Sequence, residues 1–139
     1  MKRLTRLALL LVLGCGGTGP RMVPVEGAVA FTDGSSVEVL KGYNVEFERV
    51  DRIDGKLVSS VGTLAADGSF RLTTTKPGDG AFEGNYRVVI GPPATTGDGP
   101  PPSKHLPPKY GAFDTSGLTT TIAPGSPRVM LMLERMKRN

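Results

Sequence analysis

Ser103 and His105 are the two residues of the chain that could together supply a nucleophile and a general base. A hydroxyl becomes a nucleophile when an imidazole accepts its proton and a third group orients the ring. His105 is the only histidine among 139 residues, and the residues around it are mostly polar or proline. No strand–turn–helix pattern places Ser103 at a nucleophile elbow. We therefore interpret this spacing as coincidental and predict no catalytic residue.

Glu46 and Glu48 form a pair of carboxylates on one face of an expected strand, because side chains two residues apart point the same way. Such a pair could act in acid–base catalysis or bind calcium. A zinc site needs three or four ligands, usually from His and Cys, and the chain has one of each. We favour a solvated strand face for the two glutamates, and we predict no metal and no cofactor.

The single cysteine, Cys15, has a position that indicates lipid attachment. The run Leu7–Leu13 is apolar, follows three basic residues and ends at glycine, which is the layout of a signal peptide. A membrane-spanning helix needs about 20 apolar residues, and this run is much shorter. The string Val12-Leu13-Gly14-Cys15 resembles a bacterial lipobox, although Leu13 is larger than the residue usually found at its position.

The resemblance to a lipobox implies a lipid-anchored protein of the bacterial cell envelope. Residues 1–14 would be removed, acyl chains would attach to Cys15, and residues 15–22 would form a flexible tether. Gly16, in place of an aspartate, favours the outer membrane, on its periplasmic or surface face. The alternative is a secreted protein with a coincidental cysteine.

The net charge of +4 does not indicate a polyanionic partner. Three basic residues lie in the expected signal, and removing them from the 17 leaves 14 basic residues against 13 acidic ones. We interpret the basic cluster in residues 135–139 as a solvated tail, with attraction to anionic lipid or polymer as the alternative. The chain has no tryptophan and no basic stripe, so nucleic acid is not a predicted partner.

The remainder of the chain predicts short strands and turns. Glycine and proline, 19 and 12 residues, disfavour long helices, and apolar residues alternate with polar ones. Asp-Gly pairs indicate turns, and the pair Asp67-Gly68 predicts a hairpin between its flanking strands. Gly27 predicts a bulge or a close backbone approach. Seven strands of a two-layer sandwich over residues 23–134 are expected within 23–31, 43–47, 57–64, 70–72, 86–90, 119–123 and 129–133.

Three segments resemble the carboxypeptidase regulatory-like and transthyretin-like sandwich modules, namely Val25–Val29, Gly62–Leu72 and Gly84–Val89. With Pro108-Lys109-Tyr110 and Thr115–Thr119, the pattern is similar to that of lipoproteins from planctomycete-type bacteria. The resemblance implies a prealbumin-like, Ig-like Greek-key sandwich. Modules of this kind serve as support domains, adhesion domains or ligand-holding domains. Transthyretin-like hydrolases use several His and Arg residues and a C-terminal motif that this chain does not match.

The segment 91–117 contains the candidate binding site. It holds seven of the twelve prolines, and a loop this long in a compact domain is usually functional or disordered. A polyproline II path would present an arm to a peptide, glycan or protein partner. The candidate contacts on this arm are Lys104, His105, Lys109 and Tyr110. For Tyr110 we favour an alternative, in which its ring closes one end of the sandwich.

These observations predict a membrane-anchored, non-catalytic β-sandwich module that binds an envelope or extracellular partner. A purely structural envelope component is the second hypothesis. A transthyretin-like hydrolase is the remote third.

Overall fold

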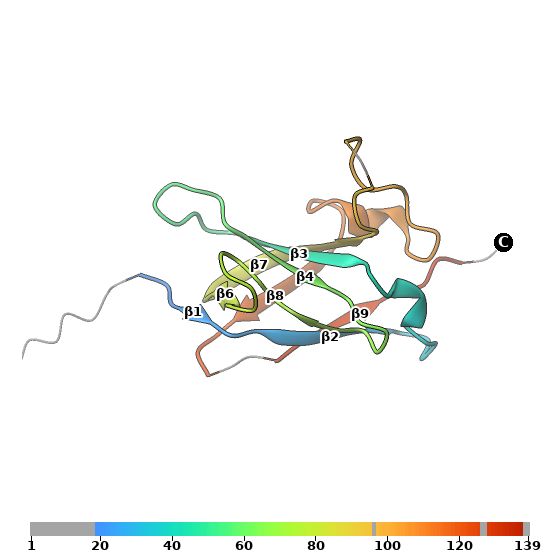
Figure 1. Ribbon diagram of the computed structural model, residues 1–139, viewed down its shortest axis with the longest axis horizontal. Helices are drawn as coiled ribbons and strands as arrows, with labels where there is room; N and C mark the ends of the chain where they lie inside the picture. Colours follow the sequence, from blue (N-terminus) through green and yellow to red (C-terminus); the bar gives the residue numbers. More distant parts are fainter. Residues whose placement is uncertain (1–18, 96, 126–127, 138–139) are drawn as a thin grey trace, which may run out of the picture.

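The chain is built almost entirely of β-strands in the computed structural model, which describes residues 19–95, 97–125 and 128–137 (Figure 1). Seven strands there have three or more residues: β2 (Glu26–Phe31), β3 (Asn44–Arg49), β4 (Ser59–Thr63), β5 (Ser69–Arg71), β7 (Gly84–Gly91), β8 (Leu118–Ile122) and β9 (Arg128–Leu133). Two short strands pair with each other, β1 (Met22–Val23) and β6 (Ala81–Phe82). Two 3-10 helices lie in connections, η1 (Glu38–Leu40) and η2 (Pro108–Gly111).

The longer strands form two sheets that pack face to face. One has the order β5-β2-β9 and the other the order β4-β3-β7-β8. Phe47 of β3 and Phe70 of β5 meet between them, with ring centroids 5.8 Å apart. All pairings are antiparallel except that of β2 with β9, which is parallel. The prediction of an all-β architecture is confirmed.

Alternation along each strand decides which side chains fill the core. Val45 and Phe47 of β3 are fully buried, while Asn44 and Glu46 lie on the outer face. The core also takes residues from the connections, including Leu106 and Tyr110. The largest fully buried side chains are Tyr86, Phe47, Leu40, Leu72, Ile90, Leu106, Ile122 and Leu133.

Gly27 on β2 lies directly opposite Phe70 on the neighbouring strand β5 of the same sheet. A Cβ atom at this position would lie 2.3 Å from Cζ of Phe70, far inside van der Waals contact. The absence of a side chain on β2 therefore makes room for the Phe70 ring. The pairing register of β2 runs through Gly27 without a bulge, and the close neighbour is a side-chain ring and not a backbone, so the predicted bulge or close backbone approach is not what the glycine serves.

The turn at Asp67-Gly68 forms, but its two arms belong to different sheets. The N–H of Gly68 donates to the carbonyl of Ala65 at 2.9 Å, and Gly68 has a φ of 82°. Beyond the turn β4 pairs with β3, and β5 pairs with β2. The two arms still meet at one antiparallel bridge, where Val61 and Thr73 exchange two backbone hydrogen bonds of 2.9 Å. The prediction of a hairpin is therefore wrong for the ladder pairing of β4 and β5, which lies with other strands. Each arm gains a full-length partner in its own sheet, and a local turn signal carries no information about that choice.

The first expected strand is also divided. The chain leaves β1 just before Pro24 and enters β2, which belongs to another sheet, just after it. The break falls at Pro24 because proline has no N–H to donate to a strand ladder. The region 32–43, between β2 and β3, contains η1. Among the described residues, no helix has the length and apolar content that a membrane crossing requires.

The sandwich has two ends, and β7 runs from one to the other. At the N-terminal end, the chain enters through Arg21 beside the start of β7. At the distal end, β7 finishes at Gly91 and the loop to β8 begins (Figure 1, orange). Eight residues of strand span roughly 25 Å. Arg21 and the loop 91–117 therefore lie at opposite ends of the domain.

A loop before β6 is held by one carboxylate, that of Asp79. It accepts hydrogen bonds from the backbone N–H groups of Thr74, Thr75 and Lys76 at 2.7, 3.0 and 2.8 Å. These hydrogen bonds hold the pKa of Asp79 below its ordinary value, with the largest effect from the N–H of Lys76 and smaller ones from those of Thr74 and Thr75.

The lowered pKa predicts an acid-sensitive contribution from Asp79. Because the folded state favours the ionised carboxylate, Asp79 stabilises the fold above pH about 4, and this contribution is lost as the pH falls through the lowered pKa. We expect Asp79→Asn to be less stable than the parent at pH 7, and the difference to shrink as the pH falls through the lowered pKa, in urea titrations over a pH series. Asp98→Asn, at an exposed position of the loop 91–117, is the control and is expected to leave the stability unchanged. A loss of stability in Asp79→Asn that stays the same throughout the pH series would show that the ionised carboxylate is not its cause.

Candidate binding site

The distal loop is pinned to the sandwich by Ser103. Its hydroxyl oxygen accepts the backbone N–H groups of His105 and Leu106, at 3.1 and 2.9 Å. It also shares a hydrogen bond of 2.9 Å with the hydroxyl of Tyr43. Leu106 is only 1% exposed, so the loop inserts a side chain into the core directly after this turn. The second half of the loop is therefore an ordered part of the domain.

Tyr110 closes the distal end of the sandwich. Its side chain is 3% exposed, and its hydroxyl accepts the N–H of Glu134 at 2.8 Å, just beyond the end of β9. Lys109 lies 5.1 Å from the centroid of the Tyr110 ring and forms an ion pair of 2.8 Å with Glu134. This ion pair raises the pKa of Lys109 and lowers that of Glu134. The interpretation of Tyr110 as a plug is confirmed.

The four candidate contacts therefore have different surroundings. Lys104 is exposed, and His105 is half-buried, with its ring centroid 6.5 Å from that of Tyr43. Lys109 is exposed but paired, and Tyr110 has little surface to offer a partner. The structure thus brings Lys109 and Tyr110 together, and among the four candidates it leaves Lys104 and the ring of His105 with unpaired surface.

Ser103 and His105 do not face each other as a nucleophile and a base would. The Ser103 hydroxyl oxygen accepts the main-chain N–H groups of His105 and Leu106, and its third hydrogen bond is with the hydroxyl of Tyr43. Its function in this arrangement is to hold the turn.

A proline-lined hollow of about 230 Å³ lies beside this pinned segment. Its floor is the end of β7, and its walls come from both halves of the loop. A second hollow of the same size shares five of its lining residues and continues to Asn44 and Glu46 on β3. We call the two together the proline groove. Its shared residues are Ile90, Gly91, Pro92, Pro100 and Gly111.

Sequence reasoning found the prolines of this groove but missed its floor and its acidic end. The string Gly91-Pro92-Pro93 directly after an apolar strand was an available signal for the floor, since a strand that ends in prolines leaves an exposed surface. Nothing local indicated that Glu46 would lie at the same groove, because β3 reaches it only by pairing with β7.

Glu46 and Glu48, which share one strand face, have different surroundings. Glu48 is 9% exposed and forms an ion pair with Arg87, whose guanidinium lies 5.3 Å from the centroid of the Phe113 ring. Glu46 faces the proline groove. In the described ranges no group of three or more His, Cys, Asp or Glu side chains is placed to hold a metal ion.

The basic tail is packed against the distal end where the structure describes it. The Arg135 guanidinium lies 5.7 Å from the centroid of the Phe31 ring, and the N–H of Met136 donates to the carbonyl of His105 at 3.0 Å. The interpretation of a solvated tail is therefore wrong for these two residues. An aromatic face and a free carbonyl at this end of the sandwich provide them with partners.

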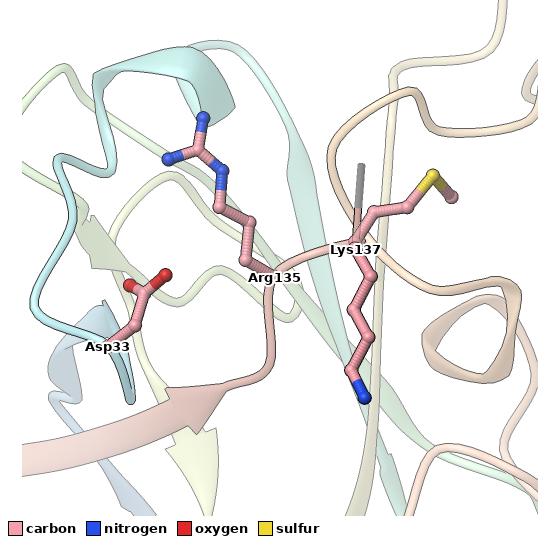
Figure 2. Close-up of a pocket in the computed structure, with 4 residues that line it drawn as sticks. Asp33, Arg135 and Lys137 are labelled. Atoms are coloured by element: carbon pink, nitrogen blue, oxygen red, sulfur yellow. The ribbon is translucent and has the colours of Figure 1, made fainter. Parts of the chain in front are cut away.

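A shallow hollow lies between this tail and the turn that follows β2 (Figure 2). Asp33 faces the side of Arg135, while Lys137 points away from both. Hydrogen bonds from Ser35 lower the pKa of Asp33, and Arg135 lowers it further. The two cations do not converge, so this hollow is not arranged to bind an anion.

Comparison with known proteins finds no match to a family model, to a curated protein or to a solved structure. Residues 1–14 and Cys15, on which the lipid anchor was predicted, lie outside the described residues.

Proposed function

We propose that this protein is a lipid-anchored module of the bacterial envelope that binds a peptide, glycan or protein partner in the proline groove. The observation that carries the proposal is the groove itself, an apolar hollow whose rim is held in place by Ser103 and Tyr110. Apolar hollows with a few fixed polar groups are the usual form of ligand sites. Glu46 at one end and Ser103 at the other supply such groups.

The position of the groove supports the same proposal. A lipid on Cys15 would hold the N-terminal end near the membrane, and the groove lies at the opposite end of β7. A partner outside the membrane would then meet the groove first. Rigid proline walls lose little conformational entropy on binding, which favours affinity.

We further propose that the sandwich is of the prealbumin-like Greek-key type found in carboxypeptidase regulatory-like and transthyretin-like modules. The crossing of residues 62–72 between the sheets and the parallel pairing of β2 with β9 support this assignment. The planctomycete-type lipoproteins named above are the group in which we expect relatives.

Site-directed photo-crosslinking in intact cells tests the partner site. A photoreactive residue at Lys104 is expected to capture a discrete partner, because Lys104 is exposed beside Ser103 at the groove. The same residue at Lys76, which is exposed in the loop held by Asp79, is the matched control. Equal products from both sites, or only copies of the protein itself, would favour a purely structural envelope component.

Metabolic labelling with an alkyne fatty acid tests the anchor independently. The parent chain is expected to take up the label and Cys15→Ser to lose it. Equal labelling of the two would rule out the lipid on Cys15 while leaving the groove proposal to the crosslinking result.

A further inference from the structure

The connection between β3 and β4 exposes apolar side chains at the N-terminal end of the domain. Val50 is 56% exposed and Leu57 is 51% exposed, although both are large and apolar. The tip is a tight turn in which Ile53 and Lys56 exchange backbone hydrogen bonds of 3.0 and 2.9 Å. We call residues 50–58 the β3–β4 loop. It is a short, closed projection (Figure 1, green, beyond the end of β3).

A chain of hydrogen bonds joins this loop to the point where the N-terminal segment enters. The N–H of Glu83 donates to the carbonyl of Arg21 at 2.8 Å. The Arg49 guanidinium then donates from Nε to the carbonyl of Glu83 at 3.0 Å, and from Nη1 to the carbonyl of Asp51 at 2.7 Å. The base of the loop is also held by the N–H of Val50, which donates to the carbonyl of Asn85 at 2.8 Å.

Arg49 is central to this arrangement because a glycine leaves room for it. A Cβ atom on Gly84 would lie 2.7 Å from Nε of Arg49. The guanidinium can therefore lie flat against the start of β7 and reach Glu83 and Asp51 together. The result is that the β3–β4 loop and Arg21 have a defined relative position.

The length of chain before Arg21 places this loop near any membrane that holds the anchor. Five residues lie between Cys15 and Arg21, and a fully extended chain over these six Cα–Cα steps spans about 20 Å. We propose that the β3–β4 loop is a second membrane contact, in which Val50 and Leu57 enter the interfacial region of the phospholipid bilayer. This inference rests on the proposed lipid at Cys15.

The charges of the loop fit a bilayer surface. Arg52 and Lys56 flank the tip, and long basic side chains can bury their stems while their charged ends stay among headgroups. Asp51 and Asp54 balance them, so the loop has no net charge. We therefore expect apolar insertion rather than attraction to anionic lipid to hold the loop, and its contact to be insensitive to salt.

Fluorescence provides a clean test because the chain has no tryptophan. Leu57→Trp in the full lipidated protein, reconstituted in phosphatidylcholine vesicles, gives a single reporter on the loop. The matched control is Met132→Trp on the outer face of β9, because Met132 is also 51% exposed. Both positions are half-exposed, so neither substitution is expected to disturb the core.

We expect the Leu57→Trp emission to be blue-shifted, quenched by lipids brominated on their acyl chains, and several-fold less sensitive to acrylamide than that of Met132→Trp. Flotation of the vesicles reports the anchor separately. A protein that floats while both reporters respond equally to acrylamide would overturn the loop contact alone. A protein that does not float would overturn the anchor and, with it, the contact that depends on it.

Discussion

Replacing Tyr110 with alanine is expected to destabilise the domain by about 3–5 kcal/mol, the range for truncation of a buried aromatic side chain. The ring is 3% exposed and lies in the core cluster together with Leu106 and Leu133. Alanine would leave a cavity at the distal end and remove the acceptor of the Glu134 N–H. Urea denaturation followed by circular dichroism measures the loss.

Two further variants divide this effect into its causes. Tyr110→Phe keeps the ring and loses the hydroxyl, so we expect a cost of about 0.5–1.5 kcal/mol. Lys104→Ala, on the exposed surface of the same loop, is expected to change stability by less than about 0.5 kcal/mol. Unchanged stability in Tyr110→Ala together with lost partner binding would show instead that the ring is a contact residue.

Gly80→Ala is expected to cost more than about 3 kcal/mol, which is unusual for so small a change. Gly80 has a φ of 96°, and a Cβ atom there would lie 1.8 Å from the carbonyl oxygen of Val23. That neighbour is backbone and cannot rotate away. The substitution would therefore force β1 away from β6 and loosen the place where the N-terminal segment joins the sandwich.

Gly78→Ala is the matched control, since Gly78 also has a positive φ, of 70°, in the same loop. The nearest atom to its added Cβ would be Cδ of Arg71 at an ordinary 3.5 Å, so only backbone strain of about 1–2 kcal/mol is expected. Trypsin cleavage after Arg21 provides a local readout, because detachment of β1 should expose this bond in Gly80→Ala alone. Equal stability of the two variants would mean that the close approach to Val23 is relieved without cost.

Features that depend on neighbouring residues could be predicted from the sequence. Alternation with a period of two assigned Val45 and Phe47 to the core and Glu46 to the surface, because successive side chains of a strand point to opposite faces. Asp67-Gly68 was correctly placed in a turn, because glycine adopts a positive φ at little cost. The all-β architecture follows from the same two local rules, applied along the chain.

Tertiary structure alone decided which strands pair and what the loops contact. The parallel pairing of β2 with β9 joins segments about 100 residues apart, and alternation gives every strand the same pattern whatever its partner. The proline groove exists because β3 pairs with β7 and brings Glu46 to the prolines. The hydroxyl of Tyr110 finds its donor, the backbone N–H of Glu134, 24 residues further along the chain and just beyond β9. Such contacts depend on how two distant segments meet in space, and the local sequence of either segment carries no information about that meeting.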